Sequence, residues 1–337
     1  MTTRVAINGF GRIGRDVLRG ALARPGGSIE VVAVNDLVPA GTLAHLLEFD
    51  STYGRLDSPV HAHGSIMSVA GKDIHVSAIP EPAGLPWREL DVDLVIEASG
   101  RFRSRAQAAG HLEAGAGKVI ITAPGKDVDA TIVLGINDDG YDPDRHDVIS
   151  NASCTTNCVA PMAMVLHRAF GVRRGLMTTI HSYTNDQSLL DGPHKDLRRA
   201  RSAAVNLIPT GTGAARALGE VLPELAGRLD GVAVRVPVED GSLTDLTVEL
   251  AEEVTAGQVN HAFAEAAAGA LKGILRYTER PIVSRDVLGD PASCVFDSGL
   301  TKAEGNLVKV FGWYDNEWGY AQRTLDLSEL VAAALID

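Results

Sequence analysis

The chain of 337 residues has few cysteines, few aromatic residues and less positive than negative charge. Its three cysteines are too few for a disulfide framework and are typical of a reducing compartment. Lysine and arginine total 31 against 43 acidic residues, so no basic stripe could cover a nucleic-acid backbone. No apolar run reaches the ~18 residues of a membrane span, and no signal peptide is visible at the start. These absences predict a cytoplasmic protein with no nucleic-acid and no membrane partner.

Metal ligands are scarce around the cysteines. Cys154 and Cys158 are close in sequence, but the residues around them include neither a histidine nor a further cysteine that could complete a zinc site. We therefore expect no bound metal.

The first part of the sequence alternates short β-rich runs with helix-like stretches, which predicts βαβ units and a doubly wound parallel sheet. The predicted strands cover residues 5–8, 29–35, 93–99 and 118–122, and the predicted helices cover 12–24, 40–47 and 103–114. Beyond residue 150 the β-type runs become longer, at 175–182, 232–238, 243–250 and 307–313, with helix-like segments at 213–222 and 257–271. This mixture predicts an α+β second domain with a mostly antiparallel sheet.

A glycine-rich turn near the N-terminus has the pattern of a dinucleotide site. Residues 8–14 read N-G-F-G-R-I-G, directly after an apolar strand and before an amphipathic helix. Gly9 would permit a tight turn, Gly11 the close approach of a pyrophosphate, and Gly14 the packing of helix on strand. Asp36 ends the second predicted strand, where a carboxylate binds a ribose hydroxyl and repels the 2′-phosphate of NADP. The sequence therefore predicts NAD as the cofactor.

One cysteine lies where a thiol can become a nucleophile. Residues 150–158 read S-N-A-S-C-T-T-N-C and join a predicted strand to a predicted helix, so Cys154 lies near a helix N-terminus that favours the thiolate. His181 ends an apolar strand and could stabilise the thiolate or take a proton. Alone, each could equally be a packing or surface residue. Together they favour a catalytic pair and leave Cys158 as a packing thiol.

Hydroxyl and guanidinium groups follow this pair, and such groups bind phosphate oxygens when they converge on one pocket. They belong to Thr184, Arg198, Arg199, Arg201, Thr212 and Arg235, with the turn at Gly213. Each one alone could be a surface charge or a turn residue.

Four motifs occur in the order and spacing of the phosphorylating glyceraldehyde-3-phosphate dehydrogenases, and the chain resembles that family over essentially its whole length. They are N-G-F-G-R-I-G-R, S-N-A-S-C-T-T-N-C, H-S-Y-T-N-D-Q from His181 and W-Y-D-N-E-W-G-Y from Trp313. The resemblance implies a Rossmann-type NAD domain over residues 1–152, completed by a C-terminal helix over 317–337. It also implies a catalytic domain over residues 153–316 and a homotetramer.

The resemblance further implies a role for individual residues, with Cys154 as the nucleophile and His181 as the base. The implied cofactor ligands are Gly9, Gly11, Arg12, Ile13, Gly14, Asp36, Thr122 and Asn316. The implied ligands of the substrate phosphate and of inorganic phosphate are Ser153, Thr155, Thr184, Arg199, Thr212, Gly213 and Arg235.

The implied activity is reversible, NAD-dependent oxidative phosphorylation of D-glyceraldehyde 3-phosphate to 1,3-bisphosphoglycerate through a cysteine thioester, a step of glycolysis and gluconeogenesis. One alternative is erythrose-4-phosphate dehydrogenase, which resembles this family but does not need phosphate in the second step. Tyr183, Thr184 and Asn185 match the triose-phosphate enzymes better. Another alternative is a binding protein that keeps the fold, but such a protein would be expected to lack Cys154 or His181.

A few residues depart from the pattern of the family near the expected site. Pro80 stands where an arginine is common, Gly211 where a serine or threonine is usual, and Glu239 and Asp240 where a neutral segment is usual. We hypothesise that these changes alter substrate affinity or tolerance to electrophilic inhibitors, as in a specialised paralogue.

Overall fold

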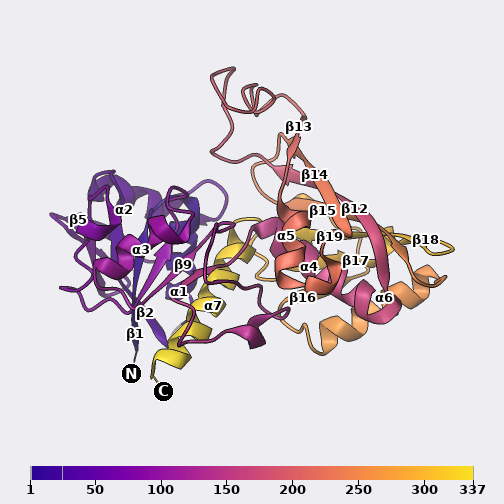
Figure 1. Cartoon of the computed structure of the whole chain (residues 1–337). Helices are drawn as coiled ribbons and strands as arrows, with labels where there is room; N and C mark the ends of the chain where they lie inside the picture. Colours follow the sequence, from indigo (N-terminus) through magenta and orange to yellow (C-terminus); the bar gives the residue numbers. More distant parts are fainter. Residues whose placement is uncertain (1, 25, 337) are drawn as a thin grey trace. The chain divides into compact units, whose positions relative to one another are not determined.

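The computed structural model describes residues 2–24 and 26–336, which form two compact units (Figure 1). The first unit comprises Met1–Ile132, Asp138–Ala152 and Ala321–Asp337, and the second comprises Val133–Asn137 and Ser153–Tyr320. Met1 and Asp337, the outer ends of the predicted NAD domain, lie outside the described residues.

A nine-stranded sheet in the order β10-β11-β9-β8-β1-β2-β7-β6-β5 forms the centre of the first unit. All neighbours from β10 to β7 run parallel, whereas β6 and β5 are antiparallel additions at one edge. The strands are β1 Thr3–Asn8, β2 Ile29–Asn35, β5 Val60–His63, β6 Ile66–Val69, β7 Lys72–Ser77, β8 Leu94–Glu97, β9 Lys118–Ile121, β10 Ala130–Thr131 and β11 Val148–Ser150, beside a small hairpin of β3 Phe49–Asp50 and β4 Gly54–Arg55. The predicted doubly wound parallel sheet is confirmed.

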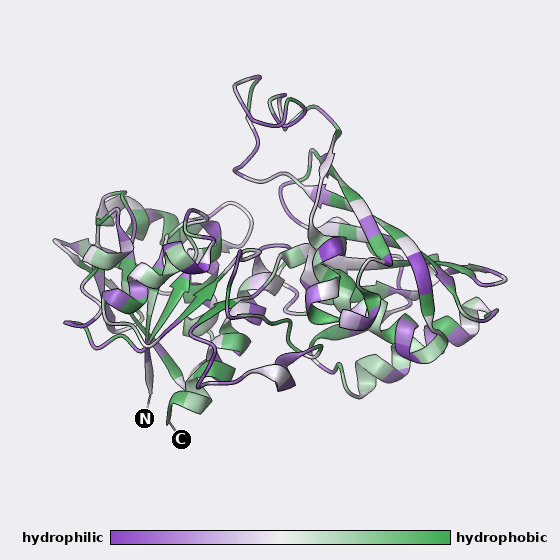
Figure 2. Cartoon of the chain, in the orientation of Figure 1, coloured by the Kyte–Doolittle hydropathy of each residue, from purple (hydrophilic) through white to green (hydrophobic). Residues whose placement is uncertain are grey.

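The helices of the first unit before its last segment are α1 Arg12–Leu22, α2 Ala40–Glu48 and α3 Arg105–Glu113, and short 3₁₀ turns lie at Pro82–Gly84 and Asp138–Gly140. Helix α3 begins two residues after its predicted start because Ser104 and Gln107 form a capping box. Strands β8 and β9 are buried along their whole length, as expected for parallel strands covered on both faces, and Figure 2 shows the apolar colour of the central strands. The edge hairpin of β5 and β6 was not predicted, because its residues alternate with polar side chains and form no apolar run.

A buried polar cluster connects the strand ends of the first unit. The Glu97 carboxylate accepts hydrogen bonds from Asn8 Nδ2 at 2.5 Å, from the Ser99 backbone N–H at 2.8 Å and from His111 Nε2 at 2.9 Å. Trp87 Nε1 donates to His111 Nδ1 at 3.0 Å, so Nδ1 is the acceptor and Nε2 carries the imidazole hydrogen. The cluster therefore fixes Asn8 and Ser99, which both line the pocket described below.

The second unit is built on an eight-stranded sheet in the order β13-β14-β12-β15-β19-β17-β16, with β18 paired to β19. Only β12 with β14 and β16 with β17 run parallel among its described pairs, so the predicted, mostly antiparallel sheet is confirmed. The strands are β12 Val172–Ser182, β13 Ile208–Gly211, β14 Leu229–Val236, β15 Ser242–Leu250, β16 Leu275–Thr278, β17 Cys294–Asp297, β18 Lys302–Glu304 and β19 Leu307–Tyr314.

Helices of the second unit pack beside this sheet, and the loop between β12 and β13 projects away from it (Figure 1). The helices are α4 Cys154–Phe170, α5 Ala214–Val221 and α6 Ala256–Ala268, with 3₁₀ turns at Pro223–Leu225, Ser284–Val287 and Ser298–Leu300. Strand β15 alternates buried and half-buried residues along its length, as expected for a sheet with one covered face.

The final helix, α7 Trp318–Ile336, returns to the first unit from Ala321 onward. Arg24 donates to Asp326 at 2.6 Å and to Gln322 at 2.8 Å, and Asn151 donates to Thr324 at 3.1 Å. These contacts make α7 part of the first unit's interior. Within the described chain, every helix is too short or too polar to cross a membrane.

Candidate active site

The chain makes a sharp turn immediately before Cys154. Strand β11 ends at Ser150, and Ala152 then adopts a positive φ of 55°, an uncommon conformation for a residue with a Cβ. Ser153 caps α4, with its Oγ accepting the Thr156 N–H at 3.0 Å, and Cys154 is the first helical residue. The predicted position of Cys154 at a strand-to-helix junction is therefore confirmed.

His181 lies beside Cys154, with Nε2 3.5 Å from Sγ. The histidine is buried near the end of β12, and its Nδ1 is 2.8 Å from the Ser182 carbonyl oxygen. In the tautomer with its hydrogen on Nδ1, donated to that carbonyl, Nε2 accepts a proton from the thiol; in the other tautomer, Nδ1 accepts the N–H of Arg235 described next. The two predicted catalytic side chains are thus within proton-transfer reach of each other.

Arg235 completes a triad of side chains with this pair. It is opposite His181 in the parallel pairing of β12 and β14, and its Nη1 lies 2.6 Å from Nδ1 and donates to the Ser182 carbonyl at 2.9 Å. Its Nε is buried and has no hydrogen-bond partner in the described part of the chain. A buried, unpaired guanidinium donor fits an anionic ligand, as the phosphate-binding prediction requires.

The charge states at the site follow from burial and from this arginine. Burial raises the pKa of the Cys154 thiol to about 11, while Arg235 and the hydroxyl and N–H of Thr155 act in the opposite direction. Burial, followed by Arg235, lowers the pKa of His181 to about 3. The helix start was predicted to favour the thiolate, but burial acts against it and has the larger effect on the pKa of Cys154. Attack by sulfur therefore requires loss of the thiol proton, and Nε2 is the base within reach.

Thr155 makes contacts that the sequence did not predict. The buried Thr155 hydroxyl hydrogen-bonds to Tyr314 Oη at 2.9 Å, and Thr179 Oγ1 lies 2.8 Å from the same phenol. The edge of the Tyr314 ring packs on His181, with centroids 5.9 Å apart. Tyr314, which the sequence analysis missed, thus joins the nucleophile's helix to the strand of His181; its position in the W-Y-D-N motif was the available signal.

Asn316 is held by two serine hydroxyls. Ser182 Oγ donates to Asn316 Oδ1 at 2.8 Å, and Ser242 Oγ donates to the same oxygen at 2.6 Å. Ser242 Oγ also accepts the Ser182 N–H at 3.1 Å. These bonds, which we call the Ser182–Ser242–Asn316 clamp, fix the carboxamide orientation and direct Nδ2 away from the serines. The sequence predicted Asn316 but missed both serines.

The other predicted anion ligands surround the loop that follows β12. Arg199 donates to Thr210 Oγ1 at 3.0 Å and pairs with Asp186, so its charge is already partly matched. Thr212 Oγ1 accepts the Ala214 N–H at 3.2 Å, next to Gly213 at the start of α5. The Thr184 N–H donates to the Gln187 side chain at 3.2 Å. Among the described residues, no direct contact joins Thr184, Thr212 or Gly213 to Cys154.

Cys158 lies one helical turn after the nucleophile and is fully buried. Its thiol donates to the Gly312 carbonyl at 3.6 Å and hydrogen-bonds with Cys294. The predicted role of Cys158 as a packing thiol is confirmed.

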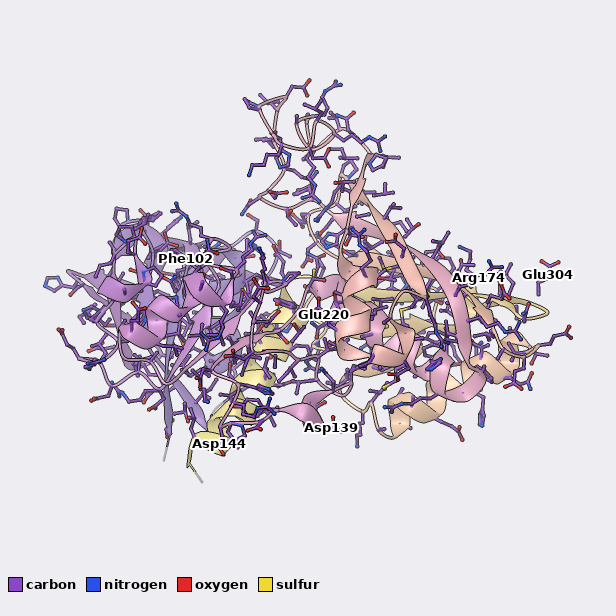
Figure 3. The ribbon with its side chains drawn as sticks, in the orientation of Figure 1. Phe102, Asp139, Asp144, Arg174, Glu220 and Glu304 are labelled. Carbon is purple, nitrogen blue, oxygen red and sulfur yellow. The ribbon has the colours of Figure 1, made fainter. Side chains whose placement is uncertain are left out.

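The first unit contains a pocket of about 220 Å³ at the glycine-rich turn. It is lined by Asn8, Gly9, Gly11, Asn35, Asp36, Leu37, Ile79, Pro80, Ala98, Ser99, Arg101 and Phe102, the last of which Figure 3 labels. Sequence analysis predicted Gly9, Gly11 and Asp36 here and missed the segment from Ala98 to Phe102. The pocket lies beyond the carboxyl ends of the parallel strands, where nucleotides bind in such sheets.

The three glycines of the turn fulfil different requirements. Gly9 has a φ of 90°, and a Cβ there would lie 2.3 Å from the Ser99 nitrogen. A Cβ on Gly14 would lie 2.2 Å from the Gly9 carbonyl oxygen. A Cβ on Gly11 would meet no described protein atom within 4 Å and would instead enter the pocket. This difference fits a ligand that approaches the backbone at Gly11 and close packing at the other two.

Polar groups around the turn also fit a dinucleotide. Gly11 is the N-cap of α1 and offers no side-chain cap, so the first N–H groups of the helix, at Arg12 and Ile13, can face a pyrophosphate. Asp36 Oδ2 accepts the Phe10 N–H at 2.8 Å, which places the carboxylate at the pocket edge. The Arg12 guanidinium is instead paired with Asp50, so only its backbone is positioned for a phosphate.

Thr122 follows the end of β9 as predicted. Its N–H and its hydroxyl both donate hydrogen bonds to the Glu97 carbonyl, at 3.0 and 3.1 Å. These two hydrogen bonds position the end of the strand, and Thr122 is not among the residues that line the pocket.

Comparisons with known proteins give one consistent result. Residues 3–105 match the model for the NAD binding domain of glyceraldehyde 3-phosphate dehydrogenase, and residues 153–316 match the model for its C-terminal domain. A glyceraldehyde-3-phosphate dehydrogenase of Streptomyces coelicolor is 60% identical over 337 residues, covering 99% of this chain and 100% of the relative. The enzyme of Geobacillus stearothermophilus is 58% identical, with 99% of both chains covered, and glyceraldehyde-3-phosphate dehydrogenase 2 of Streptomyces avermitilis is also 58% identical, with 99% and 100% covered.

Proposed function

The chain belongs to the glyceraldehyde-3-phosphate dehydrogenase family, and we propose that it catalyses the NAD-dependent oxidative phosphorylation of D-glyceraldehyde 3-phosphate with Cys154 and His181 as its reacting groups. The observation that carries this assignment is the 3.5 Å distance between Sγ and Nε2 at the start of α4. A nucleophile and a base in this geometry, next to a buried unpaired guanidinium donor, suit covalent catalysis on an anionic aldehyde.

Cys154 attacks the aldehyde carbon while Nε2 of His181 accepts the thiol proton. His181 passes that proton to the former aldehyde oxygen, which gives a hemithioacetal with a hydroxyl group, and then removes the hydroxyl proton as the carbon is oxidised to a thioester. The Cys154 N–H, the first of α4, is positioned to stabilise negative charge on the oxygen. Bound NAD supplies the acceptor for the hydride that leaves the carbon.

Inorganic phosphate then attacks the thioester, the carbon–sulfur bond breaks, and the acyl phosphate leaves with Cys154 regenerated. A thioester suits this step because it remains activated, which an oxygen ester at the same position would not. Arg235 binds phosphate oxygens through its unpaired Nε, and Arg199 contributes charge from the neighbouring loop. The remaining phosphate ligands in this proposal are Ser153, Thr155, Thr184, Thr212 and Gly213.

The cofactor ligands come from two places in the chain. Gly9, Gly11, Gly14, the backbone of Arg12 and Ile13, and Asp36 hold the dinucleotide at the turn, with Thr122 supporting the neighbouring strand end. Asp36 favours NAD over NADP because a carboxylate repels a 2′-phosphate. Asn316 offers Nδ2 to the nicotinamide carboxamide, since the two serines occupy its oxygen.

The decisive experiment measures NADH formation with glyceraldehyde 3-phosphate and with erythrose 4-phosphate, each with and without inorganic phosphate. We expect phosphate-dependent turnover of the triose phosphate and poor use of the tetrose. Phosphate-independent turnover of the triose phosphate, or none, would refute the proposal. Cys154→Ser should lose acyl transfer by on the order of 10³-fold or more while keeping NAD affinity, and retained phosphorylating activity would exclude Cys154 as nucleophile.

We further propose that the active form is a homotetramer in the cytoplasm. The second unit exposes large apolar side chains in two places, which partner chains can cover. One is the loop with Leu189, Leu190, Leu197, Val205 and Leu207, and the other is the open sheet face with Leu176, Val232 and Leu307, next to Arg174 (Figure 3) and a cavity of about 750 Å³. If each surface pairs with its own copy about a two-fold axis, the assembly is a tetramer with three two-fold axes. Sedimentation should give four times the 35.5 kDa chain mass, and a stable monomer would refute it.

A further inference from the structure

Two carboxyl groups are buried against each other beside the site. Asp240 lies in the connection between β14 and β15, and Asp315 lies between β19 and α7; they are 2% and 1% exposed. Because Ser242 at the start of β15 pairs with Tyr314 at the end of β19, the two carboxyl groups lie together beyond these strand ends, where their side chains hydrogen-bond to each other. Two carboxylates offer only acceptors, so a hydrogen bond between them requires one proton, and both cannot carry charge at this separation.

The surrounding backbone determines which carboxyl carries the proton. Asp315 accepts three backbone N–H groups, from Gly289 at 2.8 Å, Glu317 at 3.0 Å and Trp318 at 2.7 Å. Asp240 accepts the N–H of its neighbour Gly241 at 2.8 Å. Three N–H donors stabilise the anion at Asp315, so the proton resides on Asp240.

The connection that holds Asp240 has little room to move. Gly241 has a φ of 86°, and a Cβ there would lie 2.4 Å from the Ser284 carbonyl oxygen. The Tyr183 N–H donates to the Val238 carbonyl at 3.1 Å, which ties the same connection to the residues after His181. A shift of Asp240 would therefore be transmitted to the strand end of His181.

Each residue of the carboxyl pair is close in sequence to one residue of the Ser182–Ser242–Asn316 clamp. Asp315 directly precedes Asn316, and Asp240 is separated from Ser242 by Gly241. We propose that Asp240 is a protonated positioning residue, which donates its carboxyl hydrogen to Asp315 and so keeps the Ser182–Ser242–Asn316 clamp in its working geometry. The inference rests on the proposed function only for the role of Asn316.

Loss of this proton as the pH rises leaves two buried negative charges in contact, which repel and displace the connection from Asp315. Burial raises the pKa of Asp315, and the hydrogen bond from Asp240 acts against that rise. The folded chain holds the proton more tightly than the unfolded chain. The pair therefore makes its full contribution to the free energy of unfolding below pH 3.8, the ordinary pKa of an aspartate. It is lost as the pH rises through the raised pKa.

Other charged groups around the pair are few and mostly paired. Glu239 is in an ion pair with Arg285, and Asp290 is in an ion pair with Arg276. Asp286 caps the turn at Val283, and Glu317 follows the clamp. On the side of the nucleophile, Asp240 raises the pKa of Cys154 through space, whereas Arg235 lowers it; His181, in contact with both Cys154 and Arg235, is neutral.

Infrared spectroscopy of the ligand-free protein tests the proton directly. We expect a carbonyl band of a protonated carboxyl group near neutral pH, its loss in Asp240→Asn, and its reversible loss from the wild-type protein as the pH is raised. The pH titration of the wild-type band decides the question even where the variant does not fold. Coincident wild-type and Asp240→Asn spectra, or no band at neutral pH in the wild-type protein, would overturn the inference.

The pH dependence of turnover tests the positioning role. Asparagine keeps a donor to Asp315 but cannot ionise, so the alkaline fall in kcat of Asp240→Asn, scaled to its own maximum, should move up by about one pH unit or more. Glu239→Gln, which removes the neighbouring exposed carboxylate, should keep the wild-type profile. Equal profiles for Asp240→Asn and wild type, or an equal shift in Glu239→Gln, would refute the role. A wild-type protein inactive with triose phosphate at every pH would instead refute the proposed function and leave the infrared result to decide the inference.

Discussion

Arg235 and His181 are opposite each other on two parallel strands, with Nη1 2.6 Å from Nδ1. A guanidinium in this position disfavours an imidazolium and favours a thiolate, so one cation acts in opposite directions on the two reacting side chains. The strand register, rather than a flexible loop, sets this arrangement. The site can therefore take up a proton at His181 only transiently, as a base that passes the proton on.

Removing the charge of Arg235 should make Cys154 less reactive. Arg235 lowers the pKa of the thiol against the effect of burial, so Arg235→Gln should raise that pKa and move the rise of alkylation with pH to higher pH. At neutral pH we expect iodoacetamide to modify Cys154 about tenfold more slowly, as followed by mass spectrometry of the peptide. Arg235→Lys keeps the charge and should lie between the two. Equal alkylation rates in Arg235→Gln and wild type at every pH would disprove this account.

Alanine at Gly11 and alanine at Gly14 should have opposite consequences. Gly11 has a φ of −74°, which alanine tolerates, and its Cβ would enter the pocket, so we expect an unchanged melting temperature and an NAD Kd about tenfold higher. Gly14→Ala forces a Cβ to within 2.2 Å of the Gly9 carbonyl and should cost about 1–3 kcal/mol of stability. Calorimetry of NAD binding and thermal unfolding of both variants check this. A Gly11→Ala protein that binds NAD normally would contradict the position of the pyrophosphate.

Neutralising Asp36 should reduce the preference for NAD. The Asp36 carboxylate accepts the Phe10 N–H and lies in the pocket lining. Asp36→Asn removes the charge that repels a 2′-phosphate, so the ratio of NADP Kd to NAD Kd should fall by about tenfold. The matched control is Glu89→Gln, an exposed residue of the same unit, which should leave the ratio unchanged. A ratio that Asp36→Asn does not alter would place the ribose elsewhere.

Polar residues on the projecting loop should weaken assembly. Leu189 and Leu190 are 75% and 76% exposed, and a serine at both positions removes apolar area that an interface would bury. We expect sedimentation to show species smaller than the wild-type assembly. Val283→Ser changes an exposed apolar residue away from the loop and should keep the wild-type mass. If the double serine variant assembled as the wild type does, the loop would not form an interface.

Local sequence patterns predicted many helices and strands, because the spacing of apolar residues and the position of glycines determine the backbone conformation within a few residues. Strand β2 was predicted with its observed bounds, and the packing role of Gly14 followed from the motif alone. The parallel strands β1, β8 and β9 were predicted too, but the parallel strand β7 and the antiparallel hairpin of β5 and β6 were not, because short alternating strands leave a weak pattern.

Contacts between distant residues were the part that local patterns could not give. The residues next to Asn316 in the sequence do not indicate that the hydroxyls of Ser182 and Ser242 orient its side chain. Likewise, the sequence presents Arg12 as a phosphate ligand, and only the fold brings Asp50 to its guanidinium. The burial of Cys154 also depends on distant residues. Its position at the start of a helix was predicted correctly, but burial raises the pKa of its thiol, whereas the helix start was expected to favour the thiolate.

The return of α7 to the first unit has a consequence for how the protein is made. Arg24 and Asn151 bond to α7 side chains, and a Cβ on Gly20 would lie 2.6 Å from Leu325, so the helix occupies a place that the first 152 residues leave unfilled. On the ribosome, the second unit can close while the first still lacks this helix. We therefore infer that the nucleotide-binding unit, although translated first, completes its folding last, and that the apolar surface that α7 covers stays exposed on the nascent chain until then.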